Sequence, residues 1–201
     1  MNLYYGCGAW GDPLVSDKNP QPLDESTPRI RRVHLSHITA RDVKVAAGFI
    51  YGLAEMPVED VSLSDVSISL AAEAEAGYPE MAEGLELMQQ AGLFVCNAQR
   101  LRLHNVEISG QKGPAFTLAD SANVDIHACT TNTPDATGSV VNMKNVVDAF
   151  VHNCQAYTGT GIFLNVEGDQ TSGIVLGDNH LRRAKQEVYI AAGVRPDLVV
   201  S

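Results

Sequence analysis

The chain has 201 residues, of which 45% are hydrophobic and 19% are charged, a balance typical of one folded domain with a sizeable core. A formal net charge of −10 and only 6% aromatic residues disfavour a partner that is nucleic acid or an anionic membrane, because both repel negative charge. No apolar stretch approaches the roughly 18 residues of a membrane span, and the N-terminus lacks the pattern of a signal peptide, so we expect a cytoplasmic protein.

Residues 12–29 are rich in proline and charge and are predicted to form a loop inside a single domain that covers residues 1–201. A pattern then recurs: an apolar residue, any residue, a second apolar residue, two residues of any type, and a third apolar residue. It begins at Val33, Val61, Leu101, Val124, Ala149 and Ile174. The last four starts (101, 124, 149 and 174) are spaced by 23, 25 and 25 residues. Alternation with period two predicts short strands that bury one face.

A second apolar pair follows each of these units, usually behind a glycine. The pairs are Phe49 and Tyr51, Leu93 and Val95, Phe116 and Leu118, Val140 and Val141, Ile162 and Leu164, and Val188 and Ile190. A repeat of about 25 residues with two or three short strands and no helix is typical of a solenoid. The tight hairpins of a sandwich and the long amphipathic helices of a doubly wound α/β fold are missing from the pattern. The sequence therefore predicts an all-β fold, a right-handed, single-stranded parallel β-helix.

Residues 71–91 interrupt the period with an acidic insertion. Their Ala, Glu, Leu, Met and Gln residues favour a helix, which Gly77 and Pro79 interrupt. Insertions into solenoid coils gather on faces that often bind ligands, so this segment is a candidate rim loop.

Two kinds of side chain recur at equivalent positions of the repeat. Cys129 and Cys154 stand one coil apart, so we expect stacked core thiols rather than metal ligands. His104, His127 and His152 each follow the second apolar residue of a repeat and are predicted to form an outward ladder with a spacing of about 4.8 Å. A metal site on this ladder is the alternative. The sequence holds no phosphate-binding loop or dinucleotide motif, and no cofactor is expected.

Three segments carry a resemblance to a known family: TPRIRRVHLSHITARDV, IYGLAEMPVEDVSLSDV and GLFVCNAQRLRLHNVEISGQKGPAFTLADSANVDI. They resemble the later coils of polygalacturonase-type glycoside hydrolases (family 28), which are pectin-degrading proteins of the pectin-lyase-like β-helix fold. The resemblance covers roughly residues 1–130. It implies the C-terminal portion, or a truncated member, of an inverting hydrolase that acts on pectin and oligogalacturonides.

The resemblance also implies that the catalytic block is missing. Inverting glycosidases need a general acid and a general base about 6.5 to 9.5 Å apart. The family's Asn-Thr-Asp motif and Asp-Asp pair lie upstream of the matched region. The segment Asn132-Thr133-Pro134-Asp135 differs from that motif and falls in a predicted turn. We therefore expect no catalytic residue and no hydrolysis by this chain alone. An enzyme with new catalytic residues is the alternative, and its candidate acids are Asp24, Glu25, Glu55 and Glu59.

The resemblance points to three candidate substrate-binding residues, Tyr5, Arg29 and Arg31. Tyr5 best matches a substrate-side tyrosine of the family, with Tyr4 next, and the triplet Arg29-Ile30-Arg31 echoes its Arg-Ile-Lys motif. A galacturonate-containing oligosaccharide is the implied ligand, and no metal is implied. The densest basic cluster of the chain consists of Arg29, Arg31, Arg32, Arg41 and Lys44. Such a cluster could hold an acidic sugar against the overall negative field.

A non-catalytic carbohydrate-binding or structural β-helix module is the second hypothesis. The segment from Met1 to Tyr5 begins directly in an apolar strand, with no polar cap or amphipathic helix before it. An uncapped solenoid end leaves apolar ladder residues and strand edges exposed. We therefore expect the chain to form a homo-oligomer through this open end.

Overall fold

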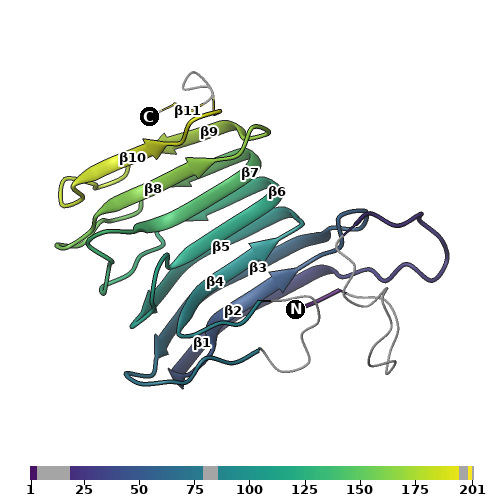
Figure 1. The fold of residues 1–201 in the computed structure, drawn as a ribbon, viewed down its shortest axis with the longest axis horizontal. Helices are drawn as coiled ribbons and strands as arrows, with labels where there is room; N and C mark the ends of the chain where they lie inside the picture. Colours follow the sequence, from purple (N-terminus) through teal and green to yellow (C-terminus); the bar gives the residue numbers. More distant parts are fainter. Residues whose placement is uncertain (4–18, 79–85, 195–198, 201) are drawn as a thin grey trace.

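The computed structural model describes residues 1–3, 19–78, 86–194 and 199–200, which form a stack of parallel strands without a helix (Figure 1). The strands are β1 (Arg31–Val43), β2 (Ala46–Tyr51), β3 (Val58–Leu70), β4 (Ala91–Cys96), β5 (Ala98–Ser109), β6 (Phe116–His127), β7 (Ser139–His152), β8 (Ile162–Glu167), β9 (Ser172–Gly177), β10 (Gln186–Ile190) and β11 (Val199–Val200). The predicted all-β parallel β-helix is confirmed.

Two ladders of parallel strands run along the stack. One passes through β1, β3, β5, β6, β7, β9 and β11, and the other through β2, β4, β6, β7, β8 and β10. The long strands β6 and β7 bend and take part in both ladders. The first coil, made of β1 and β2, lies at one end of the stack, and β10 and β11 lie at the other (Figure 1).

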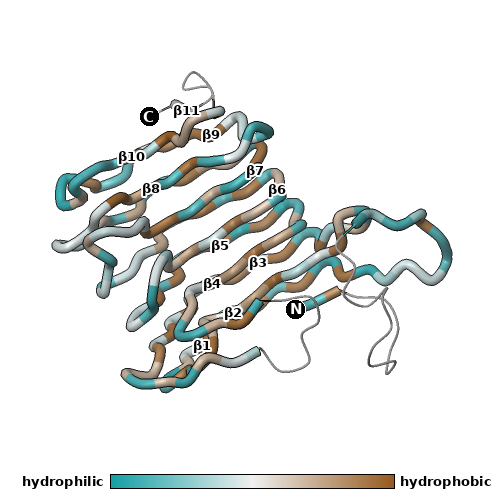
Figure 2. Tube along the Cα trace, viewed as in Figure 1, coloured by the Kyte–Doolittle hydropathy of each residue, from teal (hydrophilic) through white to brown (hydrophobic). Residues whose placement is uncertain are grey.

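The strand registers confirm the repeat residue by residue. The first inward row stacks Val33, Val61, Leu101, Val124, Ala149 and Ile174. The second inward row stacks Leu35, Leu63, Leu103, Ile126, Val151 and Leu176. Hydrophobic and hydrophilic residues alternate along the strands accordingly (Figure 2). Each apolar side chain removed from water in these rows stabilises the fold by about 1.5 to 3 kcal/mol.

The predicted inward pair on β2 is wrong by one residue. Ile50, not Phe49 or Tyr51, stacks on the inward Val95 of β4 and is buried. The two aromatic residues lie on the other face of the strand, where the ring of Tyr51 stacks against Phe94 with centroids 6.3 Å apart. Because successive side chains point to opposite faces, an offset of one residue exchanges the two faces. The predicted pairs on β4 and at the start of β6 are confirmed.

The pair predicted on β7, Val140 and Val141, is half right, whereas the pair predicted on β8, Ile162 and Leu164, shares the inward face. The inward residues there are Val141 and Met143 on β7, and Leu164 and Val166 on β8. Val140 and Phe163, on the opposite face, are buried as well. Apolar residues therefore occupy both faces of these strands, and the alternation that marks the inward face is lost.

Each coil turns at a residue with a left-handed backbone. These residues end the two-residue gap of the repeat and are His37, Asp65, Asn105, Ala128, Asn153 and Asp178, with φ from 51 to 57°. Asp and Asn adopt this conformation more readily than most residues do. The bends also contact one another, since Nδ2 of Asn105 donates to Oδ1 of Asp65 at 2.7 Å. The gap in the repeat therefore marks a corner of the coil.

The two segments that break the period are loops in their described parts. The described part of the predicted loop, residues 19–29, contains no strand. In its described parts, residues 71–78 and 86–91, the insertion does not form the helix that its composition favours. Gly77 and Met88 form an antiparallel bridge across its neck, and the buried Gln90 donates to carbonyls at its start. These arms are too short to be stable as helices on their own. Pro79, the second predicted helix break, lies outside the described residues.

Candidate functional site

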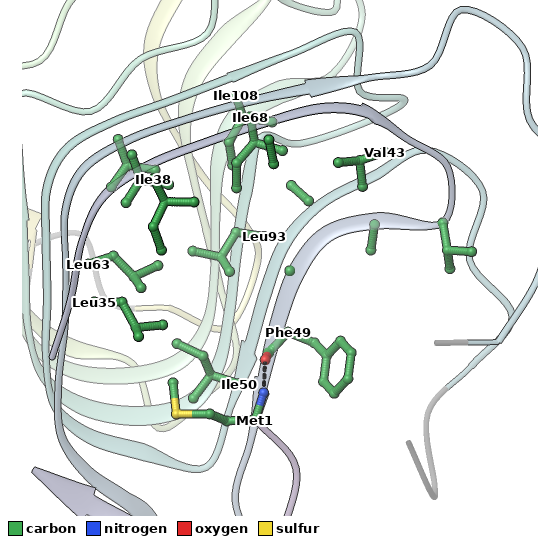
Figure 3. Close-up of a pocket in the computed structure, with 17 residues that line it drawn as sticks. Met1, Leu35, Ile38, Val43, Phe49, Ile50, Leu63, Ile68, Leu93 and Ile108 are labelled. Carbon is green, nitrogen blue, oxygen red and sulfur yellow. Dashed lines mark hydrogen bonds between the residues drawn. The ribbon is translucent and has the colours of Figure 1, made fainter. Parts of the chain in front are cut away.

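The N-terminal end of the solenoid is an apolar mouth. It encloses about 480 Å³ between β1, β2 and the coils behind them. Figure 3 shows Leu35, Ile38, Leu63 and Ile50 pointing into this space. The terminal ammonium of Met1 lies at its rim and donates to the carbonyl oxygen of Phe49 at 2.8 Å. The interior of the β-helix is therefore accessible from this end.

Exposure falls steeply from the mouth into the stack. In the second inward row, Leu35 is 39% exposed, Leu63 8% and Leu103 0%. The third apolar residue of the repeat shows the same gradient, from 37% at Ile38 to 1% at Val106. These positions are equivalent by register, and among the described residues no strand lies beyond β1, which accounts for the difference. The first coil displays to solvent the side chains that every later coil buries.

The strand at the mouth also has a free edge. β1 is 13 residues long and pairs with β3 along one edge. Within the described residues, no strand pairs with its other edge. A free strand edge offers unpaired backbone N–H and C=O groups to any extended segment. The apolar mouth and the free edge together form a surface on which a further coil could stack.

Charged residues alternate in sign from coil to coil at this end. The acids of β3 are held by donors of β5. Nη2 of Arg100 lies 2.8 Å from Oε2 of Glu59, and Nη2 of Arg102 lies 2.9 Å from Oδ1 of Asp60. Both pairs are partly exposed, so each contributes at most about 1 kcal/mol. These pairs matter here for their arrangement, because they show how the acidic strand β3 packs beside the basic strand β5.

Two of the predicted sugar-binding residues lie beside the mouth, and the third is outside the described residues. Arg29 precedes β1, and Arg31 is its first residue; both are exposed. Arg31 aligns with Glu59 of β3, but the carboxylate of Glu59 pairs with Arg100. Tyr5 falls in the segment that is not described, as does Tyr4. The role of all three in sugar binding stays a prediction.

The acidic residues considered for catalysis have local structural contacts. Oδ1 of Asp24 accepts hydrogen bonds from the hydroxyl and the amide of Ser26, and these bonds lower the pKa of Asp24. Glu59 forms its ion pair with Arg100, and Glu25 is exposed in the turn after Asp24. Glu55 lies in the loop between β2 and β3. These contacts assign structural roles to Asp24 and Glu59.

The Asn-Thr-Pro-Asp segment is a turn, as predicted. Oδ1 of Asp135 accepts hydrogen bonds from the amide and the hydroxyl of Thr137, both at 2.8 Å. The same two bonds lower the pKa of Asp135. The aspartate side chain thus shapes its own turn, which is a common use of Asp in loops.

The predicted histidine ladder is confirmed and is longer than predicted. The rings of His104 and His127 stack with centroids 4.5 Å apart, and those of His127 and His152 are 4.6 Å apart. Phe150 extends the column, with its ring 4.0 Å from that of His152. It occupies space that opens because Gly177 stands where the next coil would carry a side chain. The signal for this fourth ring was the glycine in the histidine row.

The ladder is not arranged as a metal centre. Within the described ranges, no group of three His, Cys, Asp or Glu side chains could hold a metal ion. Partial burial and the neighbouring imidazoles of His104 and His152 lower the pKa of His127. Nε2 of His152 lies 3.4 Å from Oδ2 of Asp125, and this buried nitrogen has no hydrogen-bond partner.

The core thiols stack as predicted. Cys129 and Cys154 are both buried, and the sulfur of each contacts backbone carbonyls of its own and the preceding coil. Burial raises the pKa of Cys154 to about 11 and that of Cys129 further. A thiol this hard to ionise is a poor nucleophile and metal ligand. Cys7 lies outside the described residues.

The chain is a parallel β-helix. No protein-family model matches it, and no curated protein sequence does so. Among solved structures, it is similar to PfbA, a surface adhesin of Streptococcus pneumoniae, with 17% identity and a TM-score of 0.49. The match covers 81% of this chain and 50% of that one, so this chain spans about half the length of the adhesin chain. The described residues contain no helix able to cross a membrane.

Proposed function

We propose that this chain is a non-catalytic β-helix module whose function is assembly, and that its open N-terminal end is the docking surface. The observation that carries the proposal is the exposure of Leu35, which is 39%, against 0% for the equivalent Leu103. A further coil placed on β1 would remove this apolar surface from water and pair the free backbone groups of the edge. Addition of a strand to a sheet edge is a common way for proteins to bind extended segments.

Light scattering over a range of concentrations tests whether a second copy is the cover, as the sequence predicts. If it is, the chain forms a dimer or larger assembly, and Leu35→Lys makes it monomeric because the mouth then carries a charge. The matched control is Val175→Lys, at an outward position that is 40% exposed, which should leave the assembly unchanged. A chain that stays monomeric and also binds no strand peptide at its mouth would contradict the proposal.

A second candidate function rests on the exposed arginines before and at the start of β1. The resemblance to polygalacturonase-type hydrolases supports a truncated member of that family that binds galacturonate-containing oligosaccharides through Arg29, Arg31 and Tyr5. The cytoplasmic location likewise stays a prediction.

Reducing-sugar release from polygalacturonate and short galacturonate oligomers tests the enzymatic alternative. We expect no release, because Asp24 and Glu59 are held in local contacts with Ser26 and Arg100. Calorimetric titration with trigalacturonate tests binding, which Arg31→Glu should weaken. Release that is abolished by substituting Asp24, Glu25, Glu55 or Glu59 would show that the chain is an enzyme.

A further inference from the structure

We infer that the docking surface selects its partner by charge: the segment that covers β1 is an acidic strand from another polypeptide, with the pattern of β3 and parallel to β1. This inference rests on the proposed function and names the partner of the same surface. Its basis is that β1 repeats the chemistry of β5, whose own neighbour is the acidic strand β3.

Equivalent positions of β1 and β5 carry similar donors. By register through β3, the counterparts of Arg100, Arg102 and Asn105 on β5 are Arg32, His34 and His37 on β1. Each of the three β5 side chains donates to a carboxylate of β3, at 2.7 to 2.9 Å. Each therefore contacts the coil that precedes it. The equivalent side chains of β1 have no preceding coil in the described structure. Two of them contact the following coil instead: Nδ1 of His34 lies 2.8 Å from Oγ of Ser62, and Nε2 of His37 lies 3.8 Å from Oδ2 of Asp65. Arg32 is therefore the β1 residue that repeats a β5 donor without a partner in the ion pairs described.

The carboxylates of β3 do not neutralise the arginines of β1. Glu59 and Asp60 form their ion pairs with β5, on the far side from β1. Arg31, Arg32 and Arg41 take part in none of the ion pairs found among the described residues, and all three are exposed. A chain with a net charge of −10 thus presents a strand edge with three unpaired cations at its apolar mouth. Such a patch attracts an acidic segment and repels a basic one.

A second copy fits this edge less well than an acidic strand. Stacked mouth to mouth, the arginines of one β1 would face those of the other. Stacked on the opposite end, β1 would meet the coil whose entry carries Arg182, Arg183 and Lys185, all exposed. Like charges placed opposite each other across a strand pair are destabilising. Self-stacking therefore brings arginines of β1 toward further cations in both orientations, although in the second orientation Asp178 would lie over His37.

A peptide copy of residues 58–70, VEDVSLSDVSISL, is a suitable probe for the missing strand. In the register that β3 has on β5, its valines and leucine would cover Val33, Leu35 and Ile38. Its three acids would then lie over Arg32, His34 and His37. The apolar face supplies affinity, and the acids supply selectivity, as in other strand-addition complexes.

Fluorescence anisotropy with the labelled peptide and the full chain tests the inference by charge exchange. We expect the peptide to bind the wild-type chain and to bind the double variant Arg32→Glu/His34→Glu at least about tenfold more weakly. A peptide with lysine in place of its three acids should bind the double variant more tightly than the wild-type chain. The matched control is Arg182→Glu, an exposed arginine at the other end, which should bind as the wild type does. Circular dichroism of each variant checks that the β-helix has formed.

The outcomes separate this inference from the proposed function. Equal binding of acidic and basic peptides would show that the docking surface does not select its partner by charge, and would leave the docking surface itself in place. An assembly of the chain with itself that Leu35→Lys disrupts would do the same, because a second copy would then be the cover. If neither peptide binds and the chain remains monomeric, both the inference and the proposed function fail.

Discussion

Replacing Leu103 with alanine is expected to lower the free energy of unfolding by about 3 to 4 kcal/mol, whereas Leu35→Ala should lower it by less than about 1 kcal/mol. The two leucines occupy the same inward row, two coils apart. Leu103 is fully buried, so its truncation leaves a cavity inside a packed stack. Leu35 is exposed at the mouth, so the same truncation removes little buried area.

Urea denaturation followed by circular dichroism measures both costs under one condition. Each variant serves as the control for the other, because both replace leucine with alanine in the same inward row. A Leu35→Ala cost close to that of Leu103→Ala would mean that the first coil is covered in solution and that the mouth is closed. A cost for Leu103→Ala below about 1 kcal/mol would contradict the stacked core itself.

Gly92→Ala is expected to destabilise the fold by about 3 kcal/mol, against about 1 kcal/mol for Gly113→Ala. A Cβ at Gly92 would lie 2.3 Å from the carbonyl oxygens of both Pro114 and Ala115 in the next coil. These are backbone atoms, and Ala115 is buried, so neither can move aside without disturbing the coil. At Gly113 the space is open, and the cost is only that of a φ of +77°.

Thermal unfolding of the two glycine variants gives the comparison directly, since both add one methyl group, at a crowded position in Gly92→Ala and at an open position with a positive φ in Gly113→Ala. The expected order is a markedly lower Tm for Gly92→Ala than for Gly113→Ala. The reverse order would mean that successive coils are not in close backbone contact at this corner.

The inward rows of the first sheet could be predicted from the sequence because every coil repeats the same three apolar positions. The corners were missed, although the signal was present: the gap in the repeat ends in Asp65, Asn105 and Asn153, residue types that favour a left-handed backbone. On β2 the aromatic residues Phe49 and Tyr51 were mistaken for the inward pair, because composition alone does not say which face of a strand is buried.

The candidate site needed the register of the strands. Glu59 and Arg100 are 41 residues apart in sequence, since the insertion at 71–91 separates their coils. No local pattern connects them. Once β3 lies on β5, the pair becomes a contact of 2.8 Å, and Arg32 is seen to repeat Arg100 without a partner coil. The mouth was predicted from the apolar start of the chain, whereas its charge selectivity follows only from the stacking.

Hydrogen exchange of the β1 amides, residues 31–43, tests the docking surface most directly. In the chain alone we expect these amides to exchange at least about tenfold faster than those of β5, residues 98–109, because one edge of β1 pairs with no strand of the described part of the chain. Saturating peptide 58–70 should slow exchange in β1 and leave β5 unchanged. Exchange in β1 that is already as slow as in β5, or that the peptide does not alter, would contradict an open end that accepts a further strand.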